Sequence, residues 1–177
     1  NLILGCIDSG HNVVGVLRHD RVLLDPISLG IKDFFSVNKD KSFINSLNLH
    51  EIKASSVNGE IFRKELLKLN PDILLVGSWS EKISKKTLII PKIASINCHP
   101  SLLPKYRGPN PYAQVILNGE EKTGITFHLM DSGFDTGAIL HQAEVPIYSD
   151  DTGGSLKSRC KKKKKTEIGV LLNNLEN

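Results

Sequence analysis

The chain has 177 residues, of which 40% are hydrophobic and 24% are charged, a composition typical of a soluble globular domain. It excludes disordered, fibrous and membrane-embedded classes, and a chain of this length buries roughly 70% of its unfolded surface without needing a disulfide or metal. The formal net charge is +4, but Lys161 to Lys165 supply five of the 23 basic residues, which leaves 18 against 19 acidic ones. Nucleic-acid binding through this one run is therefore a minor alternative, and we predict a single domain over residues 1–177.

Three cysteines, Cys6, Cys98 and Cys160, are widely spaced along the chain. They form no C-x-x-C pair and have no histidine at zinc spacing, which favours a reducing cytoplasm and predicts no metal site. The apolar stretch 2–7 has no basic leader and breaks at Asp8, after too few residues for a signal peptide or a membrane span. We therefore predict a cytoplasmic protein with no membrane partner.

The first half of the chain switches between helix-type and strand-type apolar patterns. Residues 2–7 are typical of the last turns of a helix, and the β-branched run 13–17 predicts a strand buried on both faces. A long connection over 18–41 follows. Asn58 is placed to cap a helix over 60–69, whose apolar side chains recur on one face.

The second half continues this alternation between short strands and helices. Strands are predicted over 72–77, 91–100, 124–130 and 138–146, and helices over 109–118 and after the turn at 152–154. Alternating elements of these two kinds predict an α/β fold.

Two polar side chains emerge at the end of the predicted strand 91–100. Asn97 and His99 are separated by one residue, which places both on the same face of a strand, and Pro100 stops the ladder there. Cys98 lies between them and is expected to pack on the opposite face. Because ligands bind at the carboxyl ends of strands in open parallel sheets, this pair is a candidate site.

The residues that follow this pair extend it into a long motif. Residues 97–108 have the pattern N-x-H-x-S-L-L-P-x-x-R-G, and residues 134–137 are F-D-T-G. In order and separation the two resemble the folate-dependent formyltransferase family, which includes methionyl-tRNA formyltransferase and the formyltransferases of nucleotide-linked amino sugars. The resemblance implies a Rossmann-like, mostly parallel sheet flanked by helices, which holds 10-formyltetrahydrofolate beside an amine acceptor.

The resemblance also implies roles for three residues. Asn97, His99 and Asp135 match the family's catalytic asparagine, histidine and aspartate. An amide N–H stabilises the oxyanion that forms when an amine attacks the formyl carbon, and an imidazole moves protons near neutral pH. A carboxylate favours the protonated imidazole. The expected mechanism needs no metal and no covalent nucleophile.

Further residues match the family's folate site by position. The motif segment contributes Ser101, Leu102, Leu103 and Pro104, and the segment after the strand 72–77 contributes Trp79, Lys82 and Ile83. Trp79 is equally compatible with a half-buried packing role. Arg107 either contacts phosphates of the acceptor or braces its loop. His128 is interpreted as a core or cleft residue within a strand, with lining of the site as the alternative.

Three departures from the family pattern bear on the acceptor. Pro109 follows Gly108 where the methionyl-tRNA enzymes have small residues, the connection at 18–26 is mixed in charge where they carry a basic insertion, and the chain ends soon after the core. We therefore expect a small-molecule amine, a nucleotide-linked amino sugar, as the acceptor, with methionyl-tRNA as the alternative.

Relatives also open with a strand, whereas this chain opens in a predicted helix. We expect the domain to lack that first strand and a C-terminal domain, and its neighbouring strand to keep unpaired backbone groups. A non-catalytic folate-binding fragment is thus a further alternative, and a formate-releasing hydrolase is a weaker one. The oligomeric state is left open, with a homodimer among the alternatives.

Overall fold

The computed structural model describes residues 2–18, 39–79 and 81–175, so most of the connection predicted over 18–41 lies outside the described residues. The described elements, in chain order, are α1 (Leu2–Asp8), α4 (Lys39–Ser46), α5 (Glu60–Leu69), β1 (Ile73–Gly77), α6 (Lys85–Leu88), β2 (Ala94–His99), α7 (Pro111–Leu117), β3 (Lys122–Leu129), β4 (Ile139–Pro146) and α8 (Gly153–Leu175).

The strands form one sheet in the order β1-β2-β3-β4. β1 and β2 are parallel, whereas β2–β3 and β3–β4 are antiparallel. The α/β fold is therefore confirmed, but the described sheet is mixed rather than mostly parallel. A short connection joins β3 to β4, and it is too short for the crossover that parallel neighbours would need.

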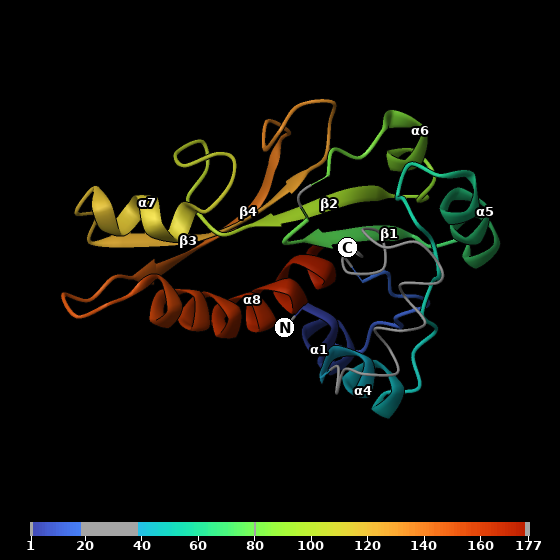
Figure 1. The fold of residues 1–177 in the computed structure, drawn as a ribbon, viewed down its shortest axis with the longest axis horizontal. Coiled ribbons are helices and arrows are strands. Elements are labelled where there is room, and N and C mark those ends of the chain that lie inside the picture. The colour runs from blue at the N-terminus through green and yellow to red at the C-terminus, as the bar shows by residue number, and fades with distance from the viewer. Residues whose placement is uncertain (1, 19–38, 80, 176–177) are drawn as a thin grey trace.

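Helices cover the sheet on both faces, as the strand alternation requires. On one face, α1 and α8 lie side by side beneath the strands (Figure 1) and pack on Ile96, Cys98 and Phe127. On the other face, Phe62 and Leu66 of α5 pack with Val76 of β1. Because side chains alternate along β2, the face that carries Asn97 and His99 is opposite the α8 face.

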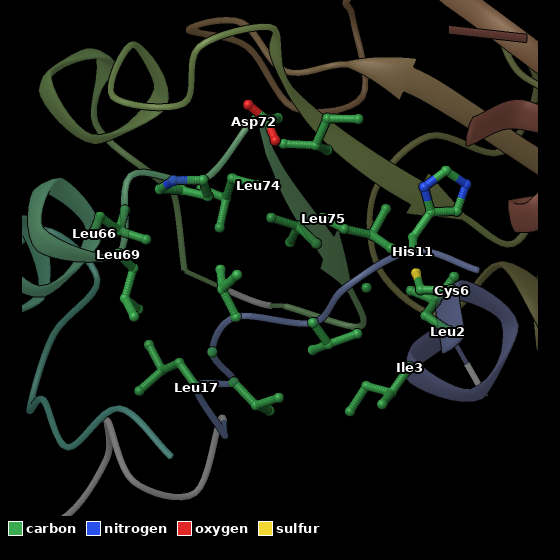
Figure 2. Close-up of a pocket in the computed structure, with 18 of the residues that line it drawn as sticks. Leu2, Ile3, Cys6, His11, Leu17, Leu66, Leu69, Asp72, Leu74 and Leu75 are labelled. Carbon is green, nitrogen blue, oxygen red and sulfur yellow. The ribbon is translucent and has the colours of Figure 1, made fainter. Parts of the chain in front are cut away.

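The predicted strand over 13–17 is wrong, because only Val16 pairs there, in an isolated parallel bridge with Glu51. This segment and the edge of β1 that does not pair with β2 line a cavity of about 790 Å³. Figure 2 shows Leu17 and Leu75 among its lining side chains. The run's apolar residues therefore face this cavity instead of a neighbouring strand in the described part of the chain. Burial of an apolar run does not by itself supply a pairing partner.

The lysine run lies within α8 and contributes to the packing of the domain. Lys165 Nζ lies 2.6 Å from Asp8 Oδ2 of α1, and Lys163 Nζ lies 2.8 Å from Glu167 Oε1 one turn along α8. Lys164 is buried against the α8 face of the sheet. Part of the run is therefore structural. None of the helices that the structure describes is long and apolar enough to cross a bilayer.

We predict that truncation of Ile96 destabilises the fold without touching the polar face of β2. Ile96 is fully buried on the α8 face, so Ile96→Ala should lower the free energy of unfolding by about 2–5 kcal/mol through lost burial and a residual cavity. The matched control is Ile93→Ala, just before β2, where the side chain is 60% exposed and the change should stay within about 0.5 kcal/mol. Urea denaturation measures both, and equal losses would contradict this description of the core.

Candidate active site

The end of β2 positions the two polar side chains that the sequence singled out. Register pairing places Asn97 opposite His128 of β3, and His99 opposite Thr126. Directly opposed residues of an antiparallel pair share a face, so these side chains converge on the same side of the sheet. Cys98 points into the core between them, where burial raises the pKa of its thiol to about 11. This disfavours a nucleophilic role for Cys98.

The carboxylate of Asp135 joins this face of the sheet to two loops. Its Oδ1 accepts a hydrogen bond of 3.0 Å from Asn97 Nδ2, and its Oδ2 accepts one of 3.0 Å from the backbone N–H of Gly108. Oδ2 also lies 3.3 Å from Nδ1 of His99. The structure thus brings together Asn97, His99 and Asp135, although Asn97 and Asp135 are 38 residues apart in the sequence.

The loop between β3 and β4 is built to present Asp135. Asp131 accepts hydrogen bonds from the N–H of Gly133 at 2.8 Å and from Oγ1 of Thr136 at 2.7 Å, which closes the loop on itself. Asp135 has a φ of 55°, a left-handed conformation that aspartate tolerates better than most residues. At Gly137 a Cβ would lie 1.9 Å from the carbonyl oxygen of Leu129, so only glycine allows this close return toward β3.

Burial and these contacts set the ionisation states of Asp135 and His99. Burial opposes ionisation of Asp135, but polar contacts with His128, the Gly108 N–H and His99 outweigh it and lower the pKa of the carboxyl from 3.8 to about 2. Burial is also the main cause that lowers the pKa of His99 below 6.5, and it exceeds the opposing effects of the Tyr106 carbonyl and of Asp135. At neutral pH the site therefore holds a carboxylate beside a largely neutral imidazole.

Comparison with known proteins places this site in a family. Residues 31–171 match the family described as Formyl transferase, which covers most of the chain. The chain belongs to the formyl transferase family. A methionyl-tRNA formyltransferase of Alkaliphilus oremlandii is 38% identical over 156 residues, which make up 86% of this chain and 48% of that protein. The chain spans about half the length of the curated relatives it matches.

Solved structures share the fold of this formyl transferase domain at low sequence identity. A phosphoribosylglycinamide formyltransferase of Streptococcus pneumoniae superposes with a TM-score of 0.79 at 17% identity, covering 100% of this chain and 93% of that one. A sugar N-formyltransferase of a Shewanella species superposes with a TM-score of 0.64 at 24% identity, covering 93% of this chain and 70% of that one. At these identities the likeness concerns the fold alone.

The motif segment after β2 is braced by hydrogen bonds within the formyl transferase domain. Ser101 Oγ donates to the Lys105 carbonyl at 2.7 Å, and the Leu103 N–H donates to Thr126 Oγ1 at 3.1 Å. Leu102 is half-buried and Pro104 is exposed. These contacts explain the fixed path of 101–104, and a folate contact of these four residues stays a prediction.

The segment after β1 lies beside the Asp135 loop. The Nζ of Lys82 is 5.8 Å from the ring centroid of Phe134, the residue before Asp135. Asn58 holds this segment, because its side chain donates to the Lys82 carbonyl at 2.9 Å and accepts from the Ser84 N–H at 2.7 Å. The prediction that Asn58 caps α5 is therefore wrong. Gly59 occupies the N-cap position, because the longer-range contacts use both ends of the Asn58 amide.

The other two residues predicted in this segment pack inward. Ile83 is buried and half-buried Trp79 packs beside it in the α5-side core. This matches the packing alternative stated for Trp79, and folate contacts of Trp79, Lys82 and Ile83 stay predictions.

His128 is the site residue that the sequence interpretation underrated. Its Nε2 lies 3.2 Å from Asn97 Nδ2 and 3.4 Å from Asp135 Oδ1, so it contacts two of the three predicted catalytic residues. Alternation along β3 offered a signal, because Thr126 and His128 alternate with the apolar Ile125 and Phe127. The pairing with β2, which brings His128 to Asn97, is visible only in the folded sheet.

We predict a pH-dependent difference in stability between the wild type and Asp135→Asn. A carboxyl whose pKa falls from 3.8 to about 2 on folding stabilises the folded state by about 2 kcal/mol above pH 4 and loses this contribution as pH falls toward 2. Asparagine tolerates the same left-handed backbone, so the variant isolates the charge. Urea denaturation from pH 7 to pH 3 should show the difference shrinking as pH falls, and a constant difference would contradict it.

Proposed function

We propose that this chain is the catalytic part of an enzyme that transfers a formyl group from 10-formyltetrahydrofolate to a primary amine. The observation that carries the proposal is the contact cluster of Asn97, His99 and Asp135 in a chain of the formyl transferase family. An amide, a neutral imidazole and a carboxylate are the groups that such a transfer needs.

Transfer replaces a folate nitrogen by an amine nitrogen on the formyl carbon. As the amine adds, the formyl oxygen becomes an oxyanion, and it reverts to a carbonyl when the bond to the folate nitrogen breaks. Asn97, half-buried at the end of β2, supplies an amide N–H to that oxygen. Preorganised donors of this kind act mainly on the transition state, because the charge that they stabilise develops only there.

The reaction also moves one proton from the attacking amine to the departing folate nitrogen. His99 Nε2 lies 2.8 Å from the Tyr106 carbonyl, which only accepts, so Nε2 carries the hydrogen of the neutral ring. Nδ1 is then the nitrogen that can accept a proton, and it faces Asp135 Oδ2 at 3.3 Å. Asp135 stabilises the imidazolium that forms, and His99 returns the proton to the leaving nitrogen, directly or through water.

Sequence identity to the relatives helps to choose between the two candidate acceptors, methionyl-tRNA and a nucleotide-linked amino sugar. Proteins named methionyl-tRNA formyltransferase match this chain at 36% to 38% identity over about 155 residues, whereas the sugar N-formyltransferase structure is 24% identical. This supports methionyl-tRNA as the acceptor over the nucleotide-linked amino sugar that we expected. Of the departures that suggested a sugar, the connection at 19–26 lies outside the described residues, and Pro109 alone does not exclude tRNA.

Arg107 is suited to a phosphate of a nucleic-acid acceptor. Its side chain is exposed and forms no hydrogen bond or ion pair within the described part of the chain, while the next residue, Gly108, donates its N–H to Asp135. A guanidinium at this position is close to the catalytic cluster and can form paired hydrogen bonds to a phosphate.

Removal of the proposed oxyanion donor tests the catalytic proposal. Asn97→Ala should reduce kcat for formyl transfer by about 10²–10³-fold while folding is retained, because a preorganised donor is lost. Asn12→Ala, an exposed asparagine in the segment after α1, is the matched control and should keep wild-type turnover. Near-normal kcat in Asn97→Ala would reject the role. Folate binding by calorimetry without any transfer by the wild type would instead favour the non-catalytic alternative.

A second measurement tests the acceptor and Arg107 together. Wild-type transfer to methionyl-tRNA should exceed transfer to an amino-sugar nucleotide, and Arg107→Ala should raise KM for the tRNA several-fold and lower the slope of log KM against log salt by about one. Lys105→Ala is the control of equal charge, because Lys105 already pairs with Glu120 at 3.3 Å. Transfer confined to the sugar nucleotide, or equal effects of both variants, would overturn this acceptor assignment.

A further inference from the structure

The amide of Asn97 has only two N–H groups, and both have partners in the cluster. Asn97 Nδ2 lies 3.0 Å from Asp135 Oδ1 and 3.2 Å from His128 Nε2. An ionised carboxylate only accepts hydrogen bonds, so the nitrogen end of the amide, not its oxygen, must face Asp135. The chemistry of the partner therefore determines the orientation of the amide, and one N–H remains for His128.

The contact of the other nitrogen, Nδ1, excludes one of the two neutral tautomers of His128. Nδ1 lies 2.8 Å from the carbonyl oxygen of Leu129, which also only accepts, so Nδ1 carries a hydrogen. Nε2 lies 3.2 Å from Asn97 Nδ2 and 3.4 Å from Asp135 Oδ1, so it either accepts the second N–H of Asn97 as part of a neutral ring or donates to the carboxylate as part of an imidazolium. The contact with Asn97 is the shorter one, which favours the neutral ring with a lone pair on Nε2. The His128 side chain is 3% exposed, so water does not compete well for these contacts. Both ring nitrogens are used, which leaves His128 no free position for proton transfer with a substrate.

This arrangement has a consequence for the oxyanion. With one N–H on Asp135 and one on His128, Asn97 has no donor left for the formyl oxygen until one partner is replaced. Asp135 is the partner that can give up its bond, because its other oxygen, Oδ2, still holds the Gly108 N–H and faces His99. If His128 keeps its bond, the plane of the amide stays where the sheet has set it.

We propose that His128, in its neutral form with the hydrogen on Nδ1, is a positioning residue for Asn97. It holds one N–H of the Asn97 amide, so that the other passes from Asp135 Oδ1 to the formyl oxygen as the oxyanion develops. The inference rests on the proposed function for the identity of that oxygen, but the hydrogen-bonding state of His128 does not depend on catalysis.

The first test measures that state directly in the full chain without substrate. Long-range ¹H–¹⁵N NMR distinguishes the two neutral tautomers and the imidazolium, and the His128→Gln spectrum assigns the signal. We expect the Nδ1–H tautomer at pH 7.5, whereas an Nε2–H ring or an imidazolium would overturn the proposal. This result stands whether or not the chain transfers formyl groups.

The second test separates positioning from packing by kinetics. His128→Leu removes the acceptor and should lower kcat about 10-fold, the effect of losing one net hydrogen bond, while KM for the folate donor changes less than twofold. His128→Gln keeps an acceptor oxygen at similar reach and should recover most of kcat. In an Asn97→Ala background, His128→Leu should lower kcat by less than a further twofold, because the amide that His128 positions is no longer present.

The matched control is His141→Leu on β4. His141 lies opposite Phe127 on the α8 face and contacts Glu167 at 2.6 Å, away from the cluster. The His141→Leu variant should leave kcat unchanged. Circular dichroism verifies that every variant is folded. If the wild type is active and the effects of His128→Leu and Asn97→Ala on kcat are fully additive, the proposal is overturned. An inactive wild type would instead count against the proposed function and leave the decision to the tautomer measurement.

Discussion

The half-buried carboxylate of Asp135 is the contact on which the rest of the site depends. It receives N–H groups from the end of β2 and from the loop at Gly108, and it comes from the loop between β3 and β4. Each donor satisfies part of a charge that burial alone would make unfavourable, and together they hold the pKa of the carboxyl at about 2. Three segments far apart in the sequence are therefore held together by one ionised group.

The sheet makes this contact specific. Cys98 and Phe127 face α8 in the core, and alternation sends their neighbours Asn97 and His128 to the opposite face at paired positions. Loss of register by one residue would bury the polar groups and expose the apolar ones, so the packing of α8 enforces the geometry of the site. The lysine run takes part in that packing through the pair of Lys165 with Asp8.

The electrostatics match the proposed chemistry. A lowered pKa keeps His99 able to accept a proton at neutral pH, and the carboxylate beside Nδ1 stabilises the imidazolium only when that proton arrives. Asn97 is the group with most competition for its hydrogens, since Asp135 and His128 both contact it. The hydrogen-bonding groups of the cluster are thus satisfied by one another, and in the proposed reaction a formyl oxygen exchanges with an existing acceptor of the Asn97 amide.

The sequence by itself determined the α/β class, the polar pair Asn97 and His99 on one strand face, and the motif that indicated the formyl transferase family. These features are local, because alternation and motif spacing act along a few residues. Only the tertiary structure decided that Asn58 holds the Lys82 segment instead of capping α5, that 13–17 borders a cavity, and that His128 meets Asn97. A local pattern reports whether a side chain is buried. Its partner comes from a segment distant in the sequence, and the pairing of strands and the packing of helices select that partner.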